Sequence, residues 1–195
     1  MPQISPAEFY ARPLRVHTFL EDVPLHDVWA VDLPRTRAGV TLEEFHRHAG
    51  RDTSIEKFPP AARALFGLRL ILGRILRLDN QRQDSGAASI ASRLTEEDRA
   101  RSSVAAGTPY GPFRVVYRFP NELLCELTNH TVRGAALSAL AETSDGYRFY
   151  FAVYVSSVGW ITPVYMALID PFRRWIVYPA MLKGIHSAWL KAATT

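Results

Sequence analysis

The stretch that most constrains this chain runs from Val158 to Lys191. Thr162 followed by Pro163 is typical of a helix start, because a threonine hydroxyl caps free N–H groups and proline fits the first turn. From there apolar side chains recur at three- and four-residue steps, which places them on one face of a helix. The members of this stripe are Tyr165, Leu168, Ile169, Phe172, Trp175, Ile176, Pro179, His186 and Leu190. A long helix with such a face needs a broad apolar surface to lie on.

Two prolines interrupt this helix. Pro171 and Pro179 each remove one backbone hydrogen bond and crowd the preceding turn, so we expect a kink at one or both. A second interpretation makes Asp170 the cap of a new helix. We favour one long, bent helix, because the apolar stripe keeps its phase across the join. A membrane span is not expected, because the apolar run before Asp170 is shorter than the ~20 residues that a bilayer requires, and Arg173 and Arg174 follow.

Composition bounds the class of protein. A chain of 195 residues with 48% hydrophobic and 22% charged residues has the profile of a folded protein, and we interpret residues 1–195 as a single domain. The net charge of +4 comes from arginines that are interleaved with acidic residues, which argues against a nucleic-acid partner. The one cysteine, Cys125, gives no disulfide framework, and the N-terminus has no apolar leader. We therefore expect a cytoplasmic protein.

The N-terminal half is predicted to contain strands and helices. Residues 1–13 have three prolines and are interpreted as an extended arm, while residues 15–21 and 27–33 are predicted strands. A threonine followed three residues later by glutamate is a capping-box pattern, which predicts a short helix over residues 41–49. A second helix is predicted over residues 61–78.

That second helix carries Phe66 and Leu70 on its basic side. Packing against the N-terminal arm, a contact in a homodimer and a lid over a cavity are the three interpretations of these side chains. The polar residues 79–106 follow, and we expect them to form a long, mobile connection with a turn of helix at Thr95–Asp98.

From Phe113 onward the apolar period changes to two, which predicts strands. They cover residues 113–119, 122–128, 133–142 and 147–155, and the Ser-Asp-Gly turn before the last one indicates a hairpin. The inner face of the last strand is predicted to hold Tyr147, Phe149, Phe151, Val153 and Val155, and its outer face Arg148, Tyr150 and Tyr154. The order of elements predicts an α+β fold, with helices on one face of a curved antiparallel sheet.

Residues 134–141 carry mainly small side chains on both faces of their predicted strand. Because interiors are close-packed, small residues opposite a helix either draw the helix in or leave a hole. An apolar hole between sheet and helix is the usual form of a small-molecule site, and the alternative is that large aromatic residues of the helix fill it. The residues expected to line such a cavity are Tyr117, Leu137, Ala139, Phe149, Phe151, Val153, Tyr165, Leu168, Phe172 and Trp175.

Three stretches carry a resemblance to known proteins: Phe58–Leu70, Glu122–Leu127 and Tyr165–Val177. Together with the order of elements, they resemble an uncharacterised bacterial family of domains of unknown function in the START, Bet v 1 and polyketide-cyclase-like (SRPBCC) superfamily. The resemblance implies a helix-grip fold, in which a curved antiparallel sheet wraps around a long C-terminal helix, and a cavity for a hydrophobic ligand. That family typically has histidine where Arg173 stands here, and it supplies no established catalytic residues.

The sequence contains no common catalytic or phosphate-binding motif. His46 and His48 are two residues apart on a predicted helix and point away from each other, so no metal site is expected there, and no cofactor is implied. The candidates for acid–base chemistry are Tyr117, Glu126 and His130, which lie on or beside the predicted strands.

Three functions remain compatible with these observations. The first is binding of a lipid- or polyketide-like molecule between the sheet and the C-terminal helix, and the second is a cyclase-type enzyme that folds such a molecule for cyclisation. Shape and a few hydrogen bonds are sufficient for catalysis of that kind, so it leaves no motif. The third is a structural or interaction domain with a filled core. We expect the protein to bind such a lipid- or polyketide-like molecule, and cyclisation of the bound molecule is a possible further activity.

Overall fold

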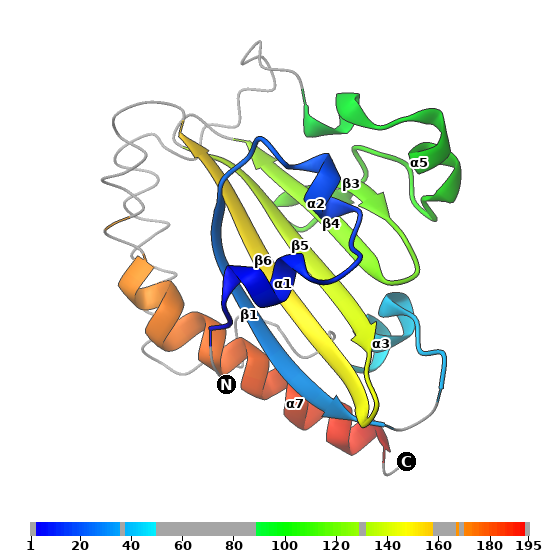
Figure 1. The fold of residues 1–195 in the computed structure, drawn as a ribbon, viewed down its shortest axis with the longest axis vertical. Helices are drawn as coiled ribbons and strands as arrows, with labels where there is room; N and C mark the ends of the chain where they lie inside the picture. The colour runs from blue at the N-terminus through cyan, green and yellow to red at the C-terminus, as the bar shows by residue number, and fades with distance from the viewer. Residues whose placement is uncertain are drawn as a thin grey trace.

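A computed structural model describes residues 3–35, 38–49, 89–128, 132–157, 167 and 170–193. At its centre is a six-stranded antiparallel sheet with the strand order β1-β6-β5-β4-β3-β2 (Figure 1). The strands are β1 (Leu25–Pro34), β2 (Pro109–Tyr110), β3 (Phe113–Arg118), β4 (Glu122–Thr128), β5 (Val132–Glu142) and β6 (Gly146–Ser157). The α+β fold class and the four strands predicted from Phe113 onward are confirmed.

Helices lie on both sides of this sheet. They are α1 (Pro6–Tyr10), α2 (Val16–Phe19), α3 (Leu42–Ala49), the 3-10 helix η3 (Ile90–Arg93), α5 (Glu96–Arg101), the π-helical turn η4 (Arg173–Val177) and α7 (Tyr178–Ala193). Figure 1 shows α1 and α2 in front of the sheet and α7 behind it. We call the side under α1, α2 and η3 the N-terminal face, and the side under α3 and α7 the helix face.

The β5–β6 hairpin decides which side chains belong to which face. Its register runs without a shift from Val132 opposite Ser157 to Glu142 opposite Tyr147. Residues that oppose each other in an antiparallel pair point to the same side, and neighbours along a strand point to opposite sides. Ala139 therefore belongs to the N-terminal face, and Leu140 belongs to the helix face.

The N-terminal face is a second core, which the sequence-based prediction missed. Tyr150 and Tyr154 were expected to point outward, but both are buried beneath the N-terminal segment. The ring of Phe9 in α1 lies 5.9 Å from the ring of Tyr150, and Phe19 of α2 packs edge-on against Tyr117 at 5.6 Å. The sheet is thus covered on both sides, because the chain before β1 folds back over it.

Two predictions for that segment were wrong. The expected extended arm contains α1, which Ser5 caps through its hydroxyl oxygen, 3.2 Å from the backbone nitrogen of Glu8, with Pro6 in the first turn. The expected strand over residues 15–21 contains α2 instead. Val16 and Phe19 are both buried, because residues three positions apart lie on the same side of a helix.

The connection before β2 also differs from the expectation of a mobile segment. Residues 89–106 include η3 and α5, and Ile90 and Leu94 are buried in the core of the N-terminal face. The turn of helix expected at Thr95 is present as α5. The Thr95 hydroxyl oxygen accepts a hydrogen bond from the backbone N–H of Asp98 at 3.1 Å, and the Asp98 carboxylate accepts one from the N–H of Thr95 at 3.3 Å.

On the helix face, aromatic side chains close one end of the core. Phe45 of α3 stacks on Phe149 at 4.8 Å and lies 5.7 Å from the ring of Trp189 in α7. The indole N–H of Trp189 donates a hydrogen bond to the carbonyl of Pro34 at 2.9 Å, which ties the end of α7 to β1. The predicted helix over residues 41–49 is confirmed as α3, with its capping box.

The C-terminal segment is helical from Asp170 to Ala193, through both prolines, but the predicted stripe is displaced. The side chains that pack on the sheet are Tyr178, Leu182, Ile185 and Trp189, one position before the expected ones, whereas Trp175 and Leu190 are exposed. In a regular helix the ring of Pro179 would collide with the carbonyl of Trp175, and the wider π turn η4 precedes it.

Several expectations concern residues outside the described ones. They are the helix over residues 61–78, the part of the polar connection over residues 79–88, and the side chains of His130, Tyr165 and Leu168. Among the residues that are described, no helix is long and apolar enough to cross a membrane.

Two glycines give opposite expectations for substitution by alanine. A Cβ on Gly146 would lie 2.1 Å from the carbonyl oxygen of Leu33, whereas nothing lies within 4 Å of a Cβ on Gly184 in α7. We expect Gly146→Ala to lower the free energy of unfolding by about 3 kcal/mol and Gly184→Ala to raise it by about 1 kcal/mol. Urea unfolding measures both. Equal effects of the two substitutions would contradict the β1–β6 register.

Candidate functional site

The residues that were expected to line one cavity lie on both sides of the sheet. Tyr117, Leu137 and Ala139 are fully buried in the core of the N-terminal face. Phe149, Phe151 and Val153 belong to the helix face. In the β5–β6 register, residues 137 and 139 oppose residues 152 and 150. They therefore point to the opposite side from the aromatic residues at 149 and 151, because neighbouring side chains along a strand alternate.

Of the four helix residues in that set, the two that the structure describes, Phe172 and Trp175, are exposed. Trp175 is 79% exposed and Phe172 is 38% exposed. They do not fill the space beside the small residues of β5, and they do not line it. The described members of the predicted set therefore do not share one face of the sheet, since Tyr117, Leu137 and Ala139 lie on the N-terminal face and Phe149, Phe151 and Val153 lie on the helix face.

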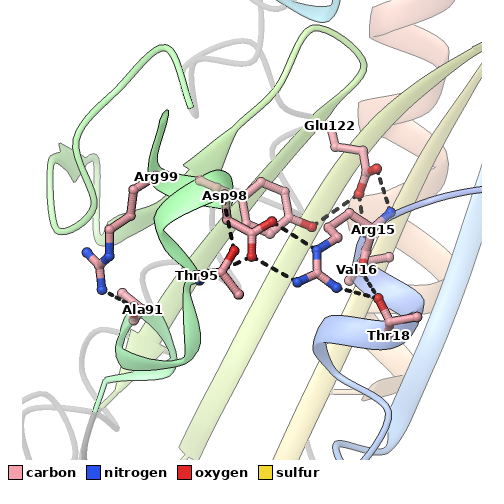
Figure 2. A network of polar contacts seen from close by, with 9 residues as sticks. Arg15, Val16, Thr18, Ala91, Thr95, Asp98, Arg99 and Glu122 are labelled. Atoms are coloured by element: carbon pink, nitrogen blue, oxygen red, sulfur yellow. Dashed lines mark hydrogen bonds and ion pairs between the residues drawn. The ribbon is translucent and has the colours of Figure 1, made fainter. Parts of the chain in front are cut away.

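On the N-terminal face, Glu122 and the acid–base candidates Tyr117 and Glu126 take part in holding the covering segments. Figure 2 shows Glu122 of β4 turned toward the start of α2, where its carboxylate accepts hydrogen bonds from the backbone N–H groups of Arg15 at 2.7 Å and Val16 at 3.2 Å. Tyr117 donates its hydroxyl to the same carboxylate at 3.1 Å. Burial raises the pKa of Glu122 and of Tyr117.

Glu126 holds the next segment in the same way. Its carboxylate accepts hydrogen bonds from the hydroxyl of Ser89 and from the backbone N–H of Ile90, the latter at 2.8 Å. Glu122 and Glu126 oppose Ala139 and Ala135, so both lie beneath the segments that they bind. Their partners are backbone groups at helix starts, which identifies these two carboxylates as caps.

An ion pair joins the two covering segments to each other. The guanidinium of Arg15 donates to both carboxylate oxygens of Asp98, at 3.0 and 2.8 Å, and connects α2 to α5 (Figure 2). The hydrogen bond from Arg15 lowers the pKa of Asp98 to about 2. Planar two-point pairing of this kind is stronger than an ordinary surface ion pair, so it helps to hold the N-terminal segment on the sheet.

The helix face contains a different polar cluster, at the junction of β1 with the start of the C-terminal helical segment. Asp27 of β1 is 3% exposed, and its Oδ2 lies 3.3 Å from the guanidinium of Arg173. Arg173 also donates to Asp170 at 3.0 Å and, through Nε, to the hydroxyl of Tyr178 at 2.7 Å. His26 Nε2 lies 2.8 Å from Asp170. We call these five residues the Asp27 cluster.

Burial and charge act against each other in the Asp27 cluster. Burial raises the pKa of Asp27, and the positive charge of Arg173 counteracts part of this rise. For Arg173 itself burial works against the charge, but Tyr178, Asp27 and Asp170 outweigh that effect and raise its pKa. The guanidinium therefore stays charged, and it is the main compensation for the buried carboxylate of Asp27.

The same cluster contains three residues of the kinds that bind metal ions. His26, Asp27 and Asp170 each present one ligand atom, and these atoms lie within 4.8 Å of one another. No metal was expected from the sequence. In this arrangement Arg173 pairs with both aspartates and already supplies the positive charge that a cation would bring. Asp170, which was considered as a helix cap, thus pairs with side chains from two elements.

Beside the Asp27 cluster the helix face is less tightly covered. Four residues that share this face are half-buried, namely Ala136 and Ser138 of β5 and Phe151 and Val153 of β6. We call them the half-buried band. The rings of Phe151 and Trp29 each contact Tyr178, at 5.4 and 5.5 Å, so the band begins where the packing of α7 on the sheet ends.

Two polar atoms next to the half-buried band lack partners. Oδ1 of Asp27 and Nε1 of Trp29 are buried and have no hydrogen-bond partner in the described part of the chain. The two residues lie two positions apart on β1, opposite Val153 and Phe151, so both belong to the helix face. Sequence analysis missed them. The available signal was an aspartate at the start of a predicted strand, directly before an apolar run.

An antiparallel sheet covered by helices on both faces, with a charged cluster under the C-terminal helix, defines the class of this protein as an α+β domain. Over residues 19–180 the chain matches the family model described as Protein of unknown function (DUF2867), and it belongs to that family. No curated protein and no solved structure matches the chain.

Replacing Arg173 with leucine leaves the buried carboxylate of Asp27 without its cation. We expect the free energy of unfolding to fall by about 3 kcal/mol, and the matched change Arg174→Leu to cost less than about 1 kcal/mol, because Arg174 is half-exposed and its ion pair with Asp170 is long at 3.8 Å. Because the pKa of Asp27 is raised from 3.8 in the folded protein, the free energy of unfolding falls as the pH rises from 3.8 to that raised pKa. Loss of the Arg173 charge raises the pKa of Asp27 further, so Arg173→Leu widens this pH interval. Urea unfolding at several pH values tests this. Equal costs for the two variants would refute the assignment.

The Arg15–Asp98 pair predicts an acid-sensitive N-terminal segment. Since the folded pKa of Asp98 is about 2, its stabilising contribution is complete above 3.8 and is lost as the pH falls from 3.8 to about 2. Asp98→Asn removes this pH dependence and costs about 2 kcal/mol at neutral pH. Asp22→Asn, at the exposed pair with Arg93, is the control with a much smaller effect. An unchanged acid profile in Asp98→Asn would contradict the assignment.

Proposed function

We propose that the protein binds a hydrophobic small molecule, of lipid- or polyketide-like character, between the sheet and the C-terminal helical segment. Support comes from the half-buried band, whose side chains are apolar or small and face the helix. The other end of the same face is packed with aromatic rings, as at Phe45 and Trp189, which favours the band as the ligand-binding part of the helix face.

The observation that carries the proposal is the pair of unpartnered buried atoms, Oδ1 of Asp27 and Nε1 of Trp29. Leaving a buried polar group without a hydrogen bond costs about 1–3 kcal/mol, and a ligand that supplies the missing partners recovers this free energy. The indole N–H donates and the carboxylate oxygen accepts. A ligand with an apolar body and a hydroxyl group at one end satisfies both atoms.

We further propose that this sheet and helix form a helix-grip fold related to the START and polyketide-cyclase-like superfamily. Support comes from the continuous antiparallel order from β1 to β2 and from the position of α7 across one face of the sheet. The sequence stretches that resemble that superfamily include β4 and the start of the C-terminal helical segment.

Cyclisation of the bound molecule is the second candidate function. The observation that favours it is again Asp27, because burial raises the pKa of its carboxyl group and one of its oxygens lacks a partner. A carboxyl group in this state can exchange a proton with a ligand. Tyr117 and Glu126 do not serve in this proposal, since both lie on the opposite face of the sheet.

Neighbouring alanines of β5 provide a matched test. Ala136 lies in the half-buried band, whereas Ala135 is buried in the core of the N-terminal face. We expect Ala136→Phe to reduce binding of anilinonaphthalene sulfonate, an apolar probe, at least tenfold while the protein stays folded. Ala135→Phe overpacks a core and costs about 1–3 kcal/mol. Fluorescence titration and thermal unfolding measure the two effects.

Native mass spectrometry of protein purified from its host tests directly whether a natural ligand is bound. A retained small molecule that is absent from Ala136→Phe supports the proposal. If wild-type protein binds neither a host molecule nor the apolar probe, and Ala136→Phe unfolds as Ala135→Phe does, the space is a filled core and the protein is a structural domain.

A further inference from the structure

The outer flank of the C-terminal helical segment carries apolar side chains that the fold does not use. Trp175 is 79% exposed, Leu190 41% and Phe172 38%. The flank consists of Trp175, Pro179, Lys183, His186 and Leu190, which recur at three- and four-residue steps and so share one side of the helix. Single exposed apolar residues are common, but exposed apolar side chains grouped beside polar ones mark interaction sites.

The charge of this segment has one sign. From Pro171 to Ala193 the sequence contains no aspartate or glutamate, while Arg174, Lys183 and Lys191 are basic. Arg173 pairs with Asp27 at 3.3 Å and Arg174 lies 3.8 Å from Asp170, so the exposed basic residues of the segment are Lys183 and Lys191. The outward side of the segment is therefore aromatic and cationic, whereas the acidic residues of its cluster lie against the sheet.

We propose that this flank docks on an anionic lipid surface. A helix that lies in the plane of a membrane presents aromatic and aliphatic side chains to the boundary between headgroups and acyl chains, with lysine or arginine beside them. Trp175 suits that boundary because its ring is apolar and its N–H stays hydrated. Each basic residue near an anionic bilayer contributes about 1 kcal/mol of attraction, which corresponds to about a fivefold gain in affinity.

The charge pattern favours a lipid surface over a second copy of the chain. Two copies that met through this flank would bring Lys183 of each near the basic residues of the other, and like charges in contact repel. An anionic surface complements the same residues. The inference is independent of the proposed ligand, because it rests on the outer side of the helical segment and not on the half-buried band.

Vesicle co-sedimentation of the full chain tests the proposal. We expect binding to vesicles of phosphatidylcholine with one-third phosphatidylserine, weak or no binding to phosphatidylcholine alone, and loss of binding at high salt. Trp175→Gln should weaken binding about tenfold, and Lys183→Gln about fivefold. Tyr10→Gln is the matched control, because Tyr10 is a half-exposed aromatic residue on α1, across the sheet, and this change should leave binding unchanged.

Three outcomes would overturn the proposal. They are absence of binding to the anionic vesicles, equal weakening by Trp175→Gln and Tyr10→Gln, and a dimer in sedimentation that Trp175→Gln dissociates while vesicles are not bound. Since none of these experiments uses an apolar ligand, their failure would leave the ligand-binding proposal standing. Failure of the ligand titration would likewise leave the lipid-surface proposal standing.

Discussion

The buried carboxylate of Asp27 determines how the C-terminal helical segment lies on the sheet. A charge that is 3% exposed needs a partner, and the partner is Arg173, at 3.3 Å. Once Arg173 faces the sheet, the π turn that follows brings Tyr178 to the same side, and the rest of α7 continues from there. This rotation turns Trp175 outward, and it places the unpartnered atoms of Asp27 and Trp29 beside the half-buried band.

Much of the fold follows from the sequence, because local signals agree with the tertiary structure there. The period-two strands, the capping boxes at Thr41 and Thr95 and the Ser-Asp-Gly hairpin are all present. The segments that were misjudged depend on distant partners. The start of α2 is capped by Glu122, which lies 107 positions from Arg15, and no local pattern reveals such a cap. The same cause hides the second core, since Tyr150 becomes an inner residue when α1 folds over it.

The candidate site was less predictable than the fold. Sequence patterns predicted that the C-terminal helix packs on the sheet, and α7 does so. Periodicity cannot show which way a helix is turned when a charged pair outweighs an apolar stripe. Ala139 and Leu137 were assigned to the wrong face, because a strand with small side chains on both sides shows no alternation that distinguishes its two faces. Asp27 and Arg173 are 146 positions apart, and their pairing appears once the chain is folded.

The most direct measurement of this account is the indole N–H signal of Trp29 compared with that of Trp189 in a nitrogen-15 NMR titration with a fatty acid. Trp189 already donates to Pro34, whereas Nε1 of Trp29 has no partner in the described part of the chain. The account predicts that the Trp29 signal moves during the titration and that the Trp189 signal stays in place. A Trp29 signal that does not respond to ligand, and that is already protected from solvent exchange by a hydrogen bond, would contradict it.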